Sequence, residues 1–386
     1  MKTCISSYLI KKIPLYITFC LGLCISIPSV AQSDVTKIVN IAQADFTKLM
    51  EAYYTPFGKA FGTSLNNGWY NTAEPLRPWK FDIRILASAS LVPNVDQTID
   101  LNSLGLSDRV VIDPNNSVTA SLFSANKGVP VQYFPEGVNN TTGASASLTL
   151  PDGFGLNILP VPLIQFNLGL PKGTELSVRF LPAIPIETDE GAIESDDNRF
   201  RAGIWGVGIK HDFQQWIPGF NLWPIKFAVA MGYTRTKINL NSSLAPTDAN
   251  LVIEGTSTSP DLSAYNNQDL ELKANSFYFG LLFSRKFPLL TFYGGARVES
   301  SNSSFAILGT YPVTIEDTDT NSSTFGQQVV REITDPFSIS RSFGQVSFNV
   351  GMRLKVGIFS LFVDYSQGTQ QYQNITAGFG FGIFDN

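Results

Sequence analysis

The stretch Asn374–Phe384, close to the C-terminus, has an apolar residue at every second position and mostly glycine in between. The apolar positions are Ile375, Ala377, Phe379, Phe381 and Ile383. In an extended strand this pattern turns one apolar face to lipid and a small or polar face to a lumen. The stretch therefore predicts a membrane-spanning β-strand. An aromatic residue near the extreme C-terminus, here Phe384, is also the usual address for the barrel-assembly machinery of the outer membrane.

The N-terminus has the features of an export signal. Basic residues precede an apolar run, Ile13–Ile27, and Ser29-Val30-Ala31 places small residues where a signal peptidase cuts. We expect residues 1–31 to be a signal peptide. All the cysteines of the chain (Cys4, Cys20 and Cys24) lie in this segment. The mature chain would then have no thiol for a disulfide, a metal site or nucleophilic catalysis.

Composition limits the class of protein. Removing the signal removes three lysines and no acids, which leaves a net charge of 24 − 32 = −8 and argues against nucleic acid as a partner. Charged residues make up only 15% of the chain, against about 25% in soluble proteins. After the signal, no apolar run reaches the 18 residues or more that a transmembrane helix needs. Apolar residues without a helical span are typical of a barrel with a lipid-facing exterior, and abundant aromatic residues fit its interfacial girdles.

Alternation with a period of two recurs along the chain and predicts an all-β fold, a transmembrane antiparallel β-barrel. The alternating segments are Lys80–Val92, 162–170, 174–182, 202–213, 225–237, 273–284, 291–299, Gln345–Val356, Phe359–Ser366 and Asn374–Phe384. Residues 108–150, through Ser117–Phe123 and Ala144–Leu150, could add a hairpin, and so could residues 305–333. We expect about 12 strands, with 10 or 14 as the alternatives.

The connections alternate between tight and long. Gly357-Ile358, Lys286–Leu290 and Pro171-Lys172-Gly173 are tight, and 216–223 is fairly short. The connections 183–199, 238–272 and 300–344 are long. Outer-membrane barrels have short periplasmic turns and longer external loops. With a periplasmic C-terminus, every tight turn falls on the periplasmic side.

A different pattern precedes the first strand, in residues 32–75. Apolar residues follow helical spacing up to Tyr53, and a second short helix is expected after Pro56. This segment could fold into the lumen as a plug or cap the barrel from the periplasm. The residues expected to form its apolar stripe are Phe46, Leu49, Phe57 and Phe61. Residues 76–386 would form the barrel.

Charged residues recur on the face of the strands that is expected to point inward. The lumen-facing candidates are Arg84, Arg179, Arg297, Arg353, Lys355 and Asp364. Lys210, Lys226, Asp82, Glu175, Asp212 and Glu299 share that face. Buried charges must be paired or hydrated. The set fits either a salt-bridged, closed lumen or a narrow aqueous pore, and its mixed sign gives no reason to expect ion selectivity.

Catalytic and metal sites are not expected. The single histidine, His211, continues the outward face of Trp205, while Asp212 points to the opposite face, so a girdle residue is favoured over a catalytic pair. The segment Asp317–Ser323 resembles the start of a calcium loop but lacks its glycine and its final glutamate. The acidic residues 187–197 could hold divalent cations that bridge lipopolysaccharide phosphates, although a hydrated external loop is the simpler interpretation. No cofactor is expected.

Three segments resemble a family of uncharacterised outer-membrane barrel proteins of Gram-negative bacteria. They are LMEAYYTPFGKAFGTSLNNGWYN (Leu49–Asn71), GLPKGTELSVRFL (Gly169–Leu181) and GIKHDFQQWIPG (Gly208–Gly219). The resemblance covers nearly the whole mature chain. More distantly, a helical N-terminus followed by a barrel is similar to the long-chain fatty-acid channel family. That likeness implies a hatch in the lumen and the sideways exit of hydrophobic ligands, and it carries over no ligand-binding residue.

These observations lead to an outer-membrane barrel of a Gram-negative bacterium, and not to an enzyme. The favoured function is a passive channel or a binding site for a small apolar solute. A structural or partner-presenting barrel is the alternative, and a membrane-embedded hydrolase is disfavoured. Expected partners are outer-membrane lipid and lipopolysaccharide, the barrel-assembly machinery and a small hydrophobic ligand, with no role for nucleic acid.

Overall fold

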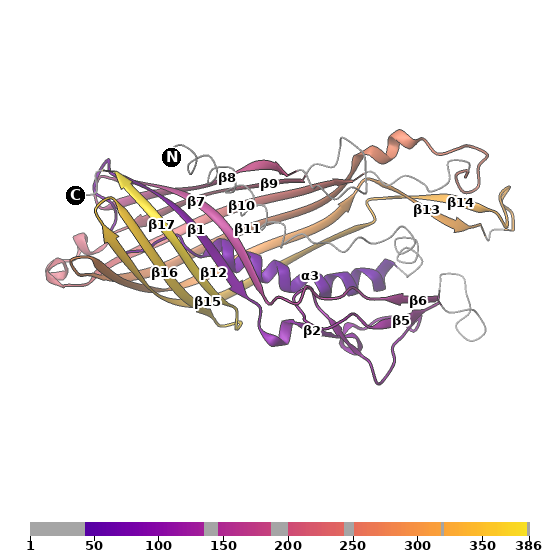
Figure 1. The fold of residues 1–386 in the computed structure, drawn as a ribbon, viewed down its shortest axis with the longest axis horizontal. Helices are drawn as coiled ribbons and strands as arrows, with labels where there is room; N and C mark the ends of the chain where they lie inside the picture. Colours follow the sequence, from indigo (N-terminus) through magenta and orange to yellow (C-terminus); the bar gives the residue numbers. More distant parts are fainter. Residues whose placement is uncertain (1–42, 135–145, 187–199, 243–250, 318–319, 384–386) are drawn as a thin grey trace, which may run out of the picture.

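A closed antiparallel barrel of ten strands forms the body of the protein (Figure 1). The structure, a computed structural model, describes residues 43–134, 146–186, 200–242, 251–317 and 320–383. The barrel strands are β1 (Phe81–Leu91), β7 (Ile158–Leu170), β8 (Thr174–Ile186), β9 (Phe200–His211), β10 (Lys226–Ser242), β11 (Gln268–Lys286), β12 (Leu290–Leu308), β15 (Phe337–Val356), β16 (Phe359–Gly368) and β17 (Gln373–Ile383). β1 pairs with both β17 and β7, which closes the barrel. The predicted all-β barrel is confirmed.

The predicted facing of the strands follows the pleat. In β15, Phe348 and Val350 are 59% and 61% exposed, whereas the alternate residues Ser347 and Asn349 are buried. The outward apolar residues form the lipid-facing surface, and the inward polar residues line the lumen.

The ten strands are the lower of the two alternatives to the expected 12. Residues 108–150 contribute no barrel strand, because their strands are only two to four residues long and pair with one another. A strand that crosses a membrane needs about 9–11 residues. The second proposed hairpin exists as β13 (Thr310–Glu316) and β14 (Gln328–Thr334), which pair with each other outside the barrel.

Several strands continue well beyond the stretches that alternate in hydrophobicity. β12 and β15 pair from Leu290 with Leu354 as far as Ile307 with Phe337, through the polar run Ser300–Ser304. Much of the predicted long loops 238–272 and 300–344 is therefore strand. The backbone ladder needs no apolar side chain, so hydrophobic alternation stops before the strand does.

The two ends of the barrel differ. At one end, the turn end, β7 joins β8 through Lys172 (φ 62°) and Gly173 (φ 62°), and β15 joins β16 through Gly357 (φ 60°). At the other end, the loop end, β11 and β12 reach 19 residues and β15 reaches 20, while β1, β16 and β17 have 10 or 11. One wall is therefore much taller than the other (Figure 1).

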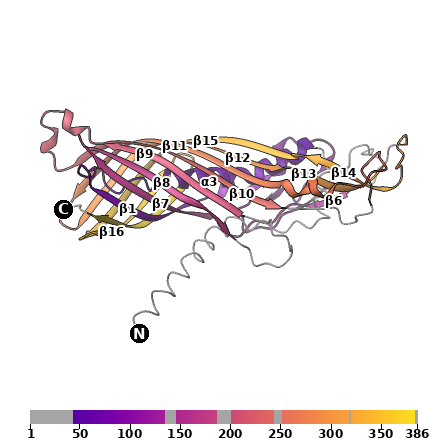
Figure 2. The same cartoon turned by 90° about the horizontal axis from the view of Figure 1, so that it is seen from above.

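One helix, α3 (Gln43–Asn66), lies inside the barrel (Figure 1 and Figure 2). It contacts β10, β11, β12 and β15 on one wall and β1 and β7 on the opposite wall. A helix on the outside could not reach both. We expected two helices separated at Pro56, but the helix is continuous through this proline. Packing on both walls holds it, and the Thr55 hydroxyl donates to Glu51 O (2.7 Å) in the same turn.

α3 is not itself a membrane span, since none of the helices in the described part of the chain combines the necessary length and apolarity. The predicted signal peptide and the beginning of the segment 32–75 lie outside the described residues. Downstream of α3, residues 67–80 cross the remaining lumen to the turn end, where β1 begins at Phe81.

An insertion between β1 and β7, residues 92–157, covers α3 where the wall is low. It contains β2 (Thr98–Asp100), β3 (Val110–Val111), β4 (Val118–Ala120), β5 (Pro130–Tyr133) and β6 (Ala146–Thr149). Its small apolar core includes Leu101, Val131 and Leu148, and Leu49 of the helix packs into it. The N-terminal half of α3 is therefore held between the tall wall and the insertion (Figure 1).

Candidate functional site

The lumen near the turn end is filled with a network of buried charges. Arg84 and Glu175 are each 1% exposed. Arg84 Nε lies 2.9 Å from Asp82 Oδ2, and Lys210 Nζ lies 3.0 Å from Glu175 Oε2. The crossing segment joins this network, because Leu76 N donates to Glu175 Oε2 (2.9 Å) and Lys210 donates to Thr72 O (3.1 Å). Within this part of the lumen, the charges are paired with one another and with the backbone of residues 67–76.

Arg179 fixes the C-terminal end of α3. Its guanidinium donates to Leu65 O (2.8 Å), to Asn67 O (2.7 Å) and to Gln165 Oε1 (2.8 Å). Leu65 O and Asn67 O are carbonyls at the end of a helix, where the helix dipole is negative and a cation is favoured. A charged side chain that is fully buried in the barrel is thus balanced by backbone dipoles.

The other lumen candidates also meet the crossing segment. Arg297 pairs with Glu299 and donates to Asn67 Oδ1, and Arg353 donates to Asn71 Oδ1 (3.2 Å).

Asp364 accepts from Tyr293 (3.3 Å) and is buried. Lys355 differs from the rest, since it is half-buried next to the turn end of β15. The sequence leaves two alternatives open, a salt-bridged lumen and a narrow aqueous pore. The described charges match the salt-bridged lumen.

The ring of Trp69 fills a notch made by two glycines. Gly208 of β9 and Gly232 of β10 lie opposite each other in register. A Cβ at Gly208 would lie 2.7 Å from the Trp69 ring, and one at Gly232 would lie 2.8 Å from it. The two strands therefore leave space for this side chain because neither residue has a Cβ.

Toward the loop end the lumen changes from polar to apolar. Phe57, Phe61 and Leu65 of α3 belong to one buried cluster. Its barrel members include Leu159, Val161, Leu163, Leu181, Ile204, Ile238, Leu272 and Ile339. The predicted stripe residues are therefore together: Phe57 and Phe61 are buried in this cluster, Leu49 packs into the insertion, and Phe46 contacts both.

Polar contacts tie α3 to its cover. Lys59 Nζ lies 2.9 Å from Asp96 Oδ2 of the insertion, and the Tyr372 hydroxyl donates to the same oxygen (2.6 Å). Burial, together with this bond to a carboxylate, raises the pKa of Tyr372 well above its usual value, so the hydroxyl remains a donor. Ser107 N also donates to Asp45 at the start of the helix (2.9 Å). Helix, insertion and the β16–β17 turn thus meet at one point.

The barrel wall is split between β7 and β8. These strands pair only from Leu170 with Thr174 to Gln165 with Arg179. Beyond that, among the described strands, Ile158–Ile164 of β7 is in register only with β1, and Phe180–Ile186 of β8 is in register only with β9. We call the boundary between Ile158–Ile164 and Phe180–Ile186 the seam. Leu159, Val161 and Leu163 turn inward behind it and belong to the apolar cluster around α3.

Prolines account for the β7 side of the seam. Gly169 N donates to Lys80 O (2.8 Å), so the odd-numbered residues of this strand direct their backbone groups toward β1. The even-numbered residues direct theirs toward β8, and among them are Pro160 and Pro162. Neither has an N–H to donate.

The β8 side has the same property. Asp212 N donates to Gly173 O (2.8 Å), so the odd-numbered residues of β8 direct their backbone groups toward β9. The backbone nitrogen of Pro182, an even-numbered residue, is directed toward the seam. A bulge between Leu181 and Ile184 exchanges the two sides, which turns Pro185 to the seam as well. Each border therefore has two fewer N–H donors where the strands would otherwise pair.

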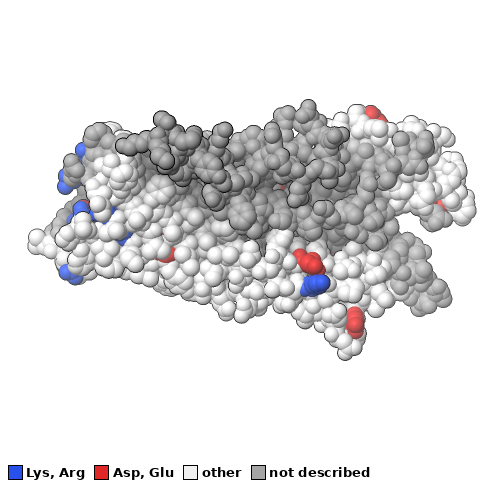
Figure 3. All heavy atoms as spheres, viewed as in Figure 1, with Lys and Arg blue, Asp and Glu red and all other residues white. Residues whose placement is uncertain are grey.

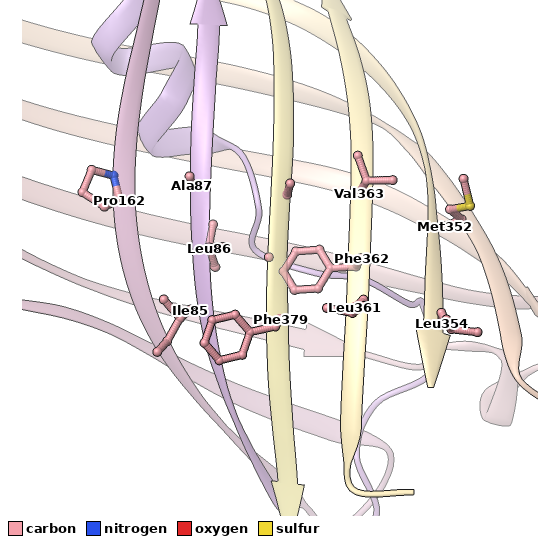
Figure 4. Close-up of a pocket in the computed structure, with 12 residues that line it drawn as sticks. Ile85, Leu86, Ala87, Pro162, Met352, Leu354, Leu361, Phe362, Val363 and Phe379 are labelled. Atoms are coloured by element: carbon pink, nitrogen blue, oxygen red, sulfur yellow. The ribbon is translucent and has the colours of Figure 1, made fainter. Parts of the chain in front are cut away.

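An apolar hollow of about 640 Å³ lies in the low wall beside the seam (Figure 4). Small residues form its floor in register: Pro162 is paired with Ala87, and Ala87 with Ala377. Ile85 and Phe379 form its rim on the lipid side, while Phe362 closes it toward the lumen. The hollow thus reaches β7, the strand whose other edge is the seam.

The remaining sequence candidates lie elsewhere. His211 ends β9, where its Nδ1 is 2.9 Å from Thr174 Oγ1 and its Nε2 accepts from Trp216 (3.0 Å). Asp317 accepts from the Thr324 hydroxyl, whereas Asp319 falls outside the described residues. The acidic residues 187–197 are likewise outside them. Over the described ranges, no three His, Cys, Asp or Glu side chains come together as a metal site would require.

Hydrophobic periodicity marks neither the crossing segment nor the seam. Asn67, Trp69 and Tyr70 follow the helix without a periodic pattern, yet all are buried in the lumen. A usable signal for the seam was present: two prolines on each side of the Lys172-Gly173 turn, at similar distances from it.

Solved structures with a similar chain path are bacterial barrels. The outer-membrane protease OmpT of Escherichia coli is 9% identical, with 80% of this chain and 98% of that chain covered and a TM-score of 0.30. The translocator domain of the autotransporter NalP of Neisseria meningitidis is 11% identical, with 88% and 99% covered and a TM-score of 0.30. The toluene transporter TodX of Pseudomonas putida is 10% identical, with 79% and 90% covered and a TM-score of 0.22.

No curated protein matches the chain significantly by sequence. A family model, described as a family of unknown function (DUF6588), matches residues 10–383. The match extends from the N-terminal segment through the last barrel strand. The chain therefore belongs to this family of unknown function, DUF6588.

Proposed function

We propose that the protein is a non-enzymatic conduit for small apolar solutes, which bind in the apolar part of the lumen and pass to the membrane through the seam. The seam is the observation that carries the proposal. In a closed barrel every strand normally pairs on both sides, since unpaired backbone in lipid costs several kcal/mol. Prolines on both borders lower this cost because they leave fewer N–H groups to satisfy.

The division of the lumen supports an apolar solute. Behind the seam lie Leu159, Val161 and Leu163, together with the aromatic residues of α3. Toward the turn end the lumen is crossed by buried ion pairs such as Lys210 with Glu175. A polar solute would have no favourable contacts in the first region. An apolar solute would be stopped by the buried ion pairs toward the turn end and would then lie beside the seam.

In this proposal α3 is a plug. It occupies the apolar part of the lumen, so entry requires a shift of its N-terminal half. The polar contacts that oppose this shift lie mostly on exposed or partly buried side chains: Lys59 with Asp96, Asp45 with Ser107, Lys48 with Gly105 O, Tyr53 with Asp152 O and Glu51 with Arg341. The C-terminal end is held more firmly, through Arg179. Movement would therefore begin at the loop end.

The test is to close the seam. Leu163 and Leu181 are both buried in the cluster behind it and are the second residues past the last pair, Gln165 with Arg179. Leu163→Cys with Leu181→Cys, bridged by a short bismaleimide, should slow the entry of the apolar fluorophore N-phenylnaphthylamine into outer-membrane vesicles. The mature chain is expected to lack cysteines, which keeps the reaction specific.

The matched control is Phe166→Cys with Val178→Cys, an outward pair in the paired part of the same two strands. Bridging it should leave entry unchanged. A second variant, Pro160→Val with Pro162→Val, returns two donors to the seam and should slow entry without any cross-link. Equal entry rates for the bridged seam, the proline variant and the wild type would reject the conduit.

A structural or partner-presenting barrel is the second candidate. The observation in its favour is the tall wall, which continues into the β13–β14 hairpin beyond the barrel. If this is the function, deletion of residues 310–334 should sensitise the envelope to detergent, while bridging the seam should have no effect. The two candidates therefore predict opposite results for the same pair of variants.

A further inference from the structure

Exposed basic residues collect at the turn end of the barrel. They are Arg77, Lys80, Lys172, Lys226, Arg285 and Lys286, which are exposed or half-exposed and come from the start of β1 and three of the turns. In Figure 3 lysines and arginines gather at this end of the visible face. Of the carboxylates at this end, Asp82 and Glu175 are buried in the ion-pair network, while Glu74 and Asp212 are exposed or half-exposed, so the accessible basic residues outnumber the accessible acidic ones.

The opposite end is mixed in charge. Its exposed carboxylates include Asp100, Asp108 and Asp113 of the insertion, together with Asp261 and Glu332, and its exposed cations include Lys127, Arg331 and Arg341. The whole chain carries a net charge of −5. A mainly basic turn end on an acidic protein is therefore not a consequence of overall composition.

Exposed tryptophans surround the basic end. Trp79 is 70% exposed, Trp216 is 63% exposed and Trp223 is 54% exposed. The last two lie in the turn between β9 and β10, which contains two short 3₁₀ turns, and Leu222 beside them is 88% exposed. Tryptophan prefers the boundary between lipid tails and headgroups. These side chains therefore place the basic residues at the depth of the headgroups.

We propose that this basic collar binds anionic phospholipid headgroups of the periplasmic leaflet, of the phosphatidylglycerol type. Short turns face the periplasm in outer-membrane barrels, so the collar meets that leaflet. Basic residues near an anionic surface are attracted to it, and the attraction of several adds up. Aromatic anchoring by Trp216 and Trp223 adds no charge preference. The selectivity for anionic over zwitterionic lipid must therefore come from the collar.

The inference does not rest on the proposed conduit and is tested separately. The detergent-purified full chain is titrated with phosphatidylglycerol or phosphatidylethanolamine, and retained lipids are counted by native mass spectrometry. The wild type should retain several-fold more phosphatidylglycerol. Lys172→Gln with Lys286→Gln should remove most of this preference, and raised salt should do the same.

Two controls separate charge from structure. Lys172→Arg with Lys286→Arg keeps the charges and should keep the preference. Lys127→Gln removes an exposed cation from the insertion at the loop end and should change nothing. Equal retention of the two lipids by the wild type would overturn the proposal, as would an equal loss in the Lys127 variant. Preferential capture of soluble peptidoglycan fragments over phosphatidylglycerol would also overturn it and assign the collar to the cell wall.

Discussion

The guanidinium carbon of Arg179 lies 3.8 Å from the centre of the Trp69 ring. Arg179 comes from β8, at the last rung before the seam opens, and Trp69 comes from the segment that crosses the lumen. The same guanidinium binds Leu65 O and Asn67 O at the end of α3. One side chain therefore joins the base of the seam, the end of the plug and the crossing segment.

Replacing Arg179 with methionine should loosen this junction. Leu65 O and Asn67 O would lose their donor inside the barrel, and a buried acceptor without a partner costs about 1–3 kcal/mol. We expect a loss of stability of that order in urea unfolding, followed by tryptophan fluorescence. Arg285→Met is the control, since Arg285 is exposed at the turn end. Equal midpoints for the two variants would argue against a structural role for Arg179.

Glu175→Gln should be more damaging than its conservative appearance suggests. Glu175 is the carboxylate next to Lys210 (3.0 Å) and lies 3.8 Å from Arg84, and all three side chains are buried. Removing one member of a buried charge network costs about 3–5 kcal/mol, because the partners stay charged.

The comparison for Glu175 is Glu254→Gln, which breaks the pair with Arg331 at the surface. An exposed pair contributes about 0–1 kcal/mol. Both variants are measured by the midpoint of unfolding in urea. A Glu175 variant no less stable than the Glu254 variant would show that the network is hydrated and loosely coupled.

Much of the barrel could be predicted because its lipid-facing surface must be apolar at every second residue. Phe348 and Val350 follow that rule, and it marked all ten strands of the wall within the lipid. Beyond the lipid the rule ends. The run Ser300–Ser304 continues β12 with no apolar alternation, so the sequence pattern predicts a loop where the structure has the tall wall.

The lumen was less predictable for a different reason. Inward charges such as Arg84 and Arg297 were identified, but their partners come from Asn67, Leu76 and other residues that no periodic pattern marks. Pro56 was expected to end a helix. The helix continues because its contacts with both walls outweigh the cost of a proline inside a helix, which is about 3 kcal/mol. Local rules cannot anticipate energies supplied by segments far apart in sequence.

The lipid-facing surface gives a direct test of register. Phe348 is 59% exposed on the outer face of β15, so Phe348→Arg places a charge in lipid at a cost of about 2–4 kcal/mol near the bilayer centre. Phe348→Leu keeps the face apolar and should assemble normally. The fraction of heat-modifiable barrel on gels measures assembly. Normal assembly of the arginine variant would mean that this face is not turned to lipid.

Gly62 is where α3 comes closest to the barrel wall. A Cβ at this position would lie 2.1 Å from Ser301 Oγ and 2.5 Å from Ser301 Cβ on β12. Gly62→Ala should therefore push the helix away from the tall wall, even though alanine favours a helix by about 1 kcal/mol over glycine. We expect higher conductance in planar bilayers, with the barrel still heat-modifiable. Ser301→Gly removes both clashing atoms, so the double variant should return to the wild-type conductance. Raised conductance that Ser301→Gly fails to reverse would place the effect outside this contact, and unchanged conductance in Gly62→Ala would argue against a plug seated on this wall.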